Sequence, residues 1–186
     1  HALEALVSNR ANYLSDILAV PAALDIIRTL PIAYANGKDM DAREMMLNAS
    51  MTAGLAFTNV SLGIVHSLAQ TIGGYFHISH GLADAIILPY IIRYNAVVPY
   101  ADKKYHDLAA KFGKTDLSEI VDDLNRRLHI PSTLREPLQE EARFESLIPE
   151  MAVTAKNDGC TKTNPIIPDV NEFAELLKRC YYGEEK

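Results

Sequence analysis

The chain has 186 residues, of which 48% are hydrophobic, and its net charge is −6 from 18 basic and 24 acidic side chains. This length predicts one domain, or one domain with a small extension, and an acidic balance without a basic patch argues against nucleic acid as a partner. The two cysteines, Cys160 and Cys180, do not make a disulfide framework, which indicates a reducing, cytoplasmic environment.

The first residues read HALEAL, a pattern typical of the middle of a helix, because no capping residue precedes Leu3 or Leu6. We therefore expect residues 2–8 to continue a helix that begins before residue 1, in a fragment of a longer protein. The opening lacks a charged region followed by an apolar one, so no signal peptide is expected.

The next helix is predicted over residues 17–30, where apolar side chains recur at helical spacing. Ser15 and Asp16 can cap it, and Pro21 is accommodated early or marks its real first turn. Asn36-Gly37 is a stop signal that ends this part of the chain.

Residues 45–83 contain no Asp, Glu, Lys or Arg. About 20 apolar residues are enough to span a bilayer, but scattered polar side chains and Gly73-Gly74 argue against a membrane segment. A helix that is apolar nearly all round and does not cross a membrane forms the centre of a soluble core. The sequence therefore predicts one long buried helix over residues 41–71, started by Asp39 or Asp41 and supported by Glu44 in a capping box.

Further helices are expected towards the C-terminus, and no segment reads convincingly as a strand. They cover residues 82–98 with a kink at Pro89, then 103–111, 116–128, 144–156, and 170–182 capped by Asp169, with a loop over 157–168. The predicted fold is all-α, with about eight helices packed around the long buried central helix.

Three histidines lie near or after the end of the predicted core helix: His66, His77 and His80. A lone histidine there is explained equally well by a buried, hydrogen-bonded imidazole. Histidines on both sides of a glycine turn beside a dry core favour a metal site, because imidazole is the commonest protein ligand for metal ions. It binds a metal in its neutral form, and apolar surroundings help keep it neutral.

Several segments resemble the iron-containing (group III) alcohol dehydrogenases. They are HALEALVS, AGLAFTNVSLGIVHSLAQTIGG, HISHGLADAIILPYIIRYN, LNRRLHIPSTL and NDGCTKTNP, and the likeness extends over the whole chain. The resemblance implies the C-terminal all-helical, metal-binding domain of a two-domain enzyme, similar to that of dehydroquinate synthase. It also implies that residues 1–186 lack the N-terminal domain, which binds the nucleotide.

In that family one Asp and three His hold the metal, and the first two ligands are arranged as D-x-x-x-H, which places both on one helix face. The resemblance places His1 at the second ligand position and His66 and His80 at the other two. The Asp then precedes residue 1. The implied cofactors are Fe(II), with Zn(II) as a substitute that binds at least as tightly, and NAD or NADP held mainly by the missing domain.

The resemblance also assigns residues around the metal. Phe57 and Cys160 would line the substrate pocket, although core packing and an ordinary loop thiol explain them as well. Relatives commonly carry a second His one turn after the His66 position, near the nicotinamide, where this chain has Gln70. His77 and His129 match no ligand, and His106 is expected to be solvated.

The implied activity is reversible hydride transfer between a small alcohol or aldehyde and NAD(P), in a homo-oligomer with no membrane partner. Relatives often have Arg after the late Asn-Pro, whereas Ile166 follows Asn164-Pro165 here. Two alternatives stay open. One is a zinc enzyme of the glycerol dehydrogenase type, and the other, for the isolated chain, is a helical binding module without turnover.

Overall fold

Helices form the secondary structure of residues 1–183, the part of the chain that this computed structural model describes. These residues contain ten α-helices, one 3₁₀ helix and no strand, so the predicted all-α class is confirmed. The helices are α1 (Ala2–Val7), α2 (Tyr13–Ala35), α3 (Met40–Val60), α4 (Ile64–Phe76), α5 (His80–Asn95), α6 (Pro99–Ala110), α7 (Leu117–Arg127), α8 (Arg135–Leu138), α9 (Glu141–Asn157), η1 (Cys160–Thr163) and α10 (Val170–Tyr182).

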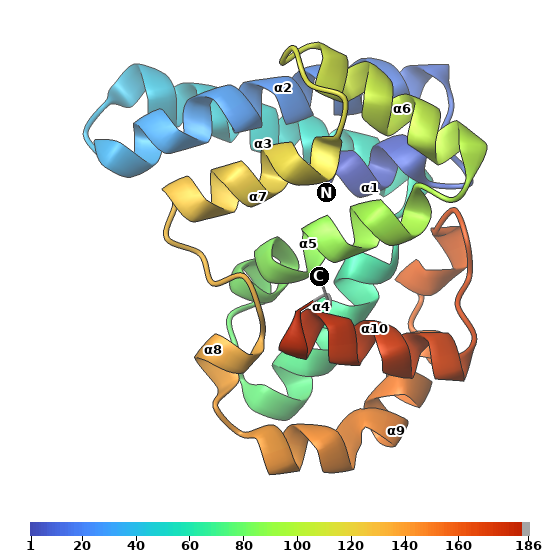
Figure 1. The fold of residues 1–186 in the computed structure, drawn as a ribbon. Coiled ribbons are helices and arrows are strands. Elements are labelled where there is room, and N and C mark those ends of the chain that lie inside the picture. Colours follow the sequence, from blue (N-terminus) through green and yellow to red (C-terminus); the bar gives the residue numbers. More distant parts are fainter. Residues whose placement is uncertain (184–186) are drawn as a thin grey trace.

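Two hydrophobic clusters make up the core, and α5 contributes to both. The first cluster joins α4, α5, α8, α9 and α10, and the second joins α1, α2, α3, α6 and α7. On α5, Ile87 and Ile91 belong to the first cluster, whereas Ile92 belongs to the second. Figure 1 accordingly shows α5 between an upper layer of helices around α2 and α3 and a lower layer around α9 and α10.

The single long core helix predicted over residues 41–71 is wrong, because the structure has two helices there. The chain leaves α3 at Ser61, which has a positive φ of 66°, and Gly63 starts α4. The axes of α3 and α4 differ in direction by 102°. Only α4 is buried nearly all round, whereas one side of α3 is exposed at Leu47 and Met51.

Several predicted boundaries also differ in detail. Asn12, rather than Ser15, caps α2, and Ser15 completes the capping box, so the helix starts earlier and runs through Pro21. Gly73-Gly74 does not end a helix, since α4 continues to Phe76. Asp39 caps α3, and Asp169 caps α10 over the predicted residues. The short helix α8 was not predicted.

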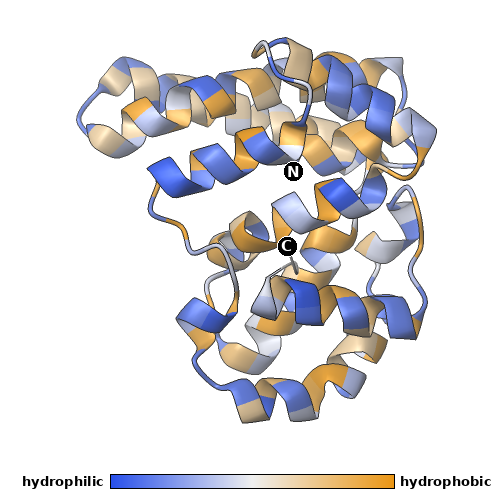
Figure 2. Cartoon of the chain, in the orientation of Figure 1, coloured by the Kyte–Doolittle hydropathy of each residue, from blue (hydrophilic) through white to orange (hydrophobic). Residues whose placement is uncertain are grey.

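Apolar residues recur along the ribbons of α2 and α3 (Figure 2), and several of their large apolar side chains are exposed. The exposed side chains are Tyr13, Leu14, Ile17, Ile32, Tyr34, Met40, Met45, Leu47, Met51 and Leu55. By length and composition α2 could cross a membrane, and 17% of its most apolar window is buried. Together, α3 and α4 are also long and apolar enough to cross a membrane, but the 102° bend between them excludes a straight span.

Candidate metal centre

The first turn of α4 is held by side chains from distant parts of the chain. Gly63 precedes the helix, and the backbone N–H groups of Ile64 and Val65 have no partner within α4. Asn164 Oδ1 accepts from Ile64 N at 3.2 Å, and Glu4 Oε1 accepts from Val65 N at 2.7 Å. These two bonds fix the direction of the helix that carries His66.

Glu4 also fixes the His66 ring. The Glu4 and His66 side chains are both buried, and His66 Nδ1 donates a hydrogen bond to Glu4 Oε2. Because a carboxylate oxygen only accepts, a proton lies on Nδ1, and in the neutral ring Nε2 carries the lone pair. Histidines that bind metals are typically oriented by a carboxylate in this way.

His1 lies directly opposite this free nitrogen. The Nε2 atoms of His1 and His66 are 3.2 Å apart, and their ring centroids are 4.5 Å apart. The His1 ring also packs on Phe57, with 4.7 Å between centroids. His1 therefore lies next to His66, the neighbour that the resemblance implied for it.

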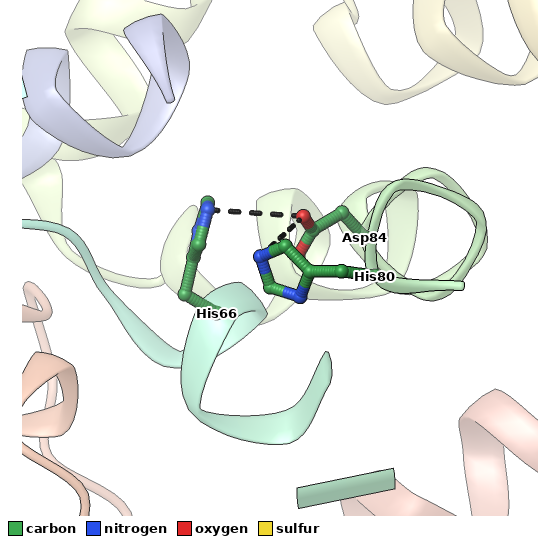
Figure 3. Close-up of side chains that lie close together, drawn as sticks. All are labelled: His66, His80 and Asp84. Atoms are coloured by element: carbon green, nitrogen blue, oxygen red, sulfur yellow. Dashed lines mark ion pairs between the residues drawn. The ribbon is translucent and has the colours of Figure 1, made fainter. Parts of the chain in front are cut away.

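α5 supplies His80 and Asp84, which are one turn apart on the same helix face. Figure 3 shows both side chains reaching towards His66 from α5. Asp84 Oδ2 lies 3.2 Å from His80 Nε2 and 3.7 Å from His66 Nε2. Burial raises the pKa of the Asp84 carboxyl above its usual range, and His66 and His80 counteract this only in part.

The spacing of these donors fits a divalent metal ion. Nitrogen ligands about 2.1 Å from a tetrahedral metal lie about 3.4 Å apart, close to the 3.2 Å between His1 and His66 Nε2. The ligand atoms of His66, His80 and Asp84 all lie within 4.8 Å of one another. Two lone pairs that face each other so closely repel, unless a cation or a shared proton lies between them.

The sequence of residues 1–181 matches the family model described as Fe-containing alcohol dehydrogenase family, C-terminal. The chain belongs to the iron-containing alcohol dehydrogenase family. The resemblance inferred from the sequence is therefore confirmed.

Relatives of this chain include the 1-propanol dehydrogenase PduQ of Salmonella typhimurium, which is 38% identical over 96% of this chain and 51% of its own length. Alcohol dehydrogenase 4 of Saccharomyces cerevisiae is 36% identical over 97% of this chain and 48% of its own. The solved iron-containing alcohol dehydrogenase of Thermococcus thioreducens superposes with a TM-score of 0.91 at 34% identity, over 99% of this chain and 48% of that one. The chain thus spans about half the length of these relatives.

The resemblance also singled out Phe57, Gln70 and Cys160, which differ in burial and in their contacts. Phe57 is half-buried and contacts His1. Gln70 lies on α4 one turn beyond His66, and its side chain is exposed, without a hydrogen bond among residues 1–183. Cys160 is half-buried at the start of η1, and burial together with the Asp158 carboxylate raises the pKa of its thiol to about 12.

The other three histidines lie on the surface, outside the cluster. His77 is the exposed C-cap of α4 and has a positive φ of 56°. His106 Nδ1 lies 3.2 Å from the Thr115 carbonyl oxygen, and His129 is exposed after α7.

Sequence analysis missed three residues of the site: Glu4, Asp84 and Asn164. Glu4 stands three residues after His1 and Asp84 four residues after His80, so helical spacing placed both near a predicted ligand. No local signal pointed to Asn164, which reaches Ile64 across 100 positions in the sequence.

Proposed function

We propose that residues 1–186 are the C-terminal, metal-binding part of an alcohol dehydrogenase that transfers hydride reversibly between a small alcohol or aldehyde and NAD(P). The observation that carries this proposal is the convergence of His1, His66 and His80 from three separate helix ends. We propose that these three histidines hold the metal and that an upstream domain binds most of the nucleotide.

The residues of this chain prepare the site for an oxygen-bearing substrate. His1, His66 and His80 would hold a divalent metal, which would supply Lewis acidity that lowers the pKa of an alcohol. Glu4 holds the His66 ring in the orientation in which Nε2 faces the other histidines, and the His66 side chain is itself buried. Family membership favours Fe(II), although nitrogen and oxygen donors by themselves bind Zn(II) at least as tightly.

The surroundings of His1 support a small substrate with an apolar end. His1 borders a cavity of about 210 Å³ whose other walls are mainly aliphatic, including Leu3, Ile27 and Leu88. Relatives are described as a 1-propanol dehydrogenase and an NADPH-dependent butanol dehydrogenase. We propose a short primary alcohol as the substrate. Phe57, which packs on His1, is proposed to lie against its reacting end, and Cys160 is proposed to line the substrate pocket, although neither residue lines the cavity beside His1.

Gln70 is proposed to position substrate or nicotinamide by hydrogen bonding, because an amide donates and accepts but does not titrate. In the complete enzyme, Gln70→His should add an ionisation to the pH profile of kcat/KM between about pH 6 and 8. Gln70→Ala should lose rate or affinity while keeping its metal. If both variants keep the parent's rate and profile, Gln70 has no place in the active site.

The central test measures metal content and alcohol oxidation in the complete enzyme, meaning this chain joined to its own upstream domain. His66→Ala and His80→Ala should lose bound metal and lower kcat/KM by about a thousandfold or more, as expected when several kcal/mol of Lewis-acid stabilisation are lost. His106→Ala, at an exposed position on α6, is the control and should retain both its bound metal and its kcat/KM. Full metal content in the first two variants would overturn the assignment.

The donor set also supports a second candidate, a zinc enzyme of the glycerol dehydrogenase type. Elemental analysis of the protein purified without added metal, with rates for monoalcohols and vicinal diols, separates the two. Iron with a preference for monoalcohols supports the first proposal. A cytoplasmic homo-oligomer is proposed in either case, to be tested by cell fractionation and light scattering.

A further inference from the structure

Asp84 is a carboxylate at the centre of the site that the family's ligand pattern does not use. It lies in the second turn of α5, and its side chain is 19% exposed. Its Oδ2 atom faces the Nε2 atoms of two histidines, at 3.2 Å and 3.7 Å. Its Oδ1 atom is buried and has no hydrogen-bond partner among the described residues.

A carboxylate in this position lacks the partners that burial normally requires. Within the described part of the chain, the ion-pair partners of Asp84 are His66 and His80, which carry a charge only when protonated, and an imidazole that presents its Nε2 lone pair is neutral. A buried charge that is neither paired nor hydrogen-bonded is costly, and a metal ion is one of the few groups that satisfies it. The other atoms nearby that could bind the same ion are the imidazole nitrogens.

We propose that Asp84 is a direct ligand of the metal held by His1, His66 and His80, an inference that rests on the proposed metal site. Its Oδ2 atom supplies the oxygen donor, so residues 1–186 contain a complete set of three imidazoles and one carboxylate. The chain then binds a divalent metal without any residue that precedes His1. An additional upstream aspartate would be a fifth protein ligand and would further reduce the positive charge at the metal.

A simpler role for Asp84 makes a different prediction. As an ion-pair partner one turn from His80, it would only hold that imidazole in place, and the carboxylate would not contact the metal. Removing a partner of that kind lowers metal affinity by about 10- to 100-fold. A loss of affinity alone therefore does not distinguish the two roles, and the carboxylate itself must be observed.

The test combines affinity with a spectroscopic readout on the 186-residue chain. Zn(II) affinity is measured by competition with a chelator for the unmodified chain, Asp84→Asn, and the control Asp25→Asn on α2. The chain is also labelled with ¹³C at aspartate carboxyls, and Asp84→Glu assigns the Asp84 signal. We expect the signal to shift on stoichiometric Zn(II) addition and Asp84→Asn to bind at least about tenfold more weakly, with Asp25→Asn unchanged.

An Asp84 signal that does not move when Zn(II) saturates the chain would overturn the proposal, as would an unchanged affinity in Asp84→Asn. Circular dichroism and melting in the presence of a chelator check that each variant folds, and the labelled unmodified chain gives its result even if a variant does not. His66→Ala and His80→Ala test the underlying site separately. If they leave Zn(II) affinity unchanged, the proposed function fails as well; if they abolish binding, only the role of Asp84 is in question.

Discussion

At the scale of single residues, Glu4 connects the parts of the candidate site. One carboxylate oxygen satisfies the N–H of Val65 and the other accepts from His66 Nδ1, so a single buried side chain fixes both the helix and the ring that it carries. It stands on α1, three residues after His1. The distance between two proposed ligands therefore depends on a residue that is not itself a ligand.

Glu4→Gln should weaken metal binding by about 10- to 100-fold, because the amide is a poorer partner for His66 Nδ1–H. It should also lower the free energy of unfolding by about 1–3 kcal/mol, since a buried group loses a charge-assisted bond. Chelator competition and chemical denaturation measure the two effects. Glu44→Gln, at an exposed position on α3, is the matched control, and equal behaviour of the two variants would contradict this role.

Cys160 should react slowly with thiol reagents. Burial, and then the Asp158 carboxylate, raises the pKa of its thiol to about 12. A raised pKa keeps the thiol protonated, so at pH 8 only about one molecule in ten thousand carries the reactive thiolate. Alkylation by iodoacetamide, followed by peptide mass spectrometry, should rise about tenfold for each pH unit from 8 to 10. A rate that levels off near pH 9 would show an ordinary thiol.

At the scale of elements, the junction between α3 and α4 decides where His66 points. A Cβ atom added at Gly63 would lie 2.5 Å from Asn164 Oδ1 and 2.9 Å from Glu4 Oε1. Both oxygens are buried and already accept the first N–H groups of α4. Only glycine at position 63 leaves room for the Asn164 and Glu4 side chains to lie this close to the backbone.

Gly63→Ala should therefore lower both thermal stability and metal affinity, by displacing Glu4 and Asn164. We expect a loss of about 1–3 kcal/mol, typical of overpacking in a tight core, measured by urea denaturation. Gly54→Ala is the matched control, because nothing lies within 4 Å of the added carbon on α3. It should stabilise the helix by about 0.5–1 kcal/mol, so a Gly63 variant that is equally stabilised would refute the explanation.

At the scale of the whole molecule, the candidate site lies where the two hydrophobic clusters meet. His1 comes from α1 in the second cluster, whereas His66 and His80 come from α4 and α5 beside the first. The position of the cluster of histidines therefore depends on how the two halves of the core pack together. A change in that packing should alter metal affinity without altering any ligand.

The 186-residue chain should bind no dinucleotide tightly and should not oxidise alcohols. Residues 1–183 contain no strand and hence no strand–glycine-loop–helix unit of the kind that binds dinucleotides. Calorimetry with NAD and NADP, and an assay with primary alcohols, are compared between this chain and the complete enzyme. Comparable turnover by the chain alone would refute the proposal that an upstream domain binds the nucleotide while this chain binds the metal.

Much of the fold and part of the site followed from the sequence, because both depend on local patterns. Capping residues and helical spacing predicted most helices, with Asp169 and α10 matching the structure residue for residue. The motif around His66 and His80 gave the family. These signals are readable because a helix and its caps depend on residues only a few positions apart.

Only the tertiary structure decided the features that depend on contacts between distant segments. The charge-free stretch looked like one helix, since nothing in it revealed that Asn164 and Glu4 would cap a new helix at Ile64 and Val65. Helical spacing already placed Asp84 one turn from His80, but only the packing of α5 beside α4 brought it close to His66 as well. The sequence determined which residues are available for the site, and the tertiary contacts of His1 and Glu4 with α4, together with the position of α5, determined which of them meet.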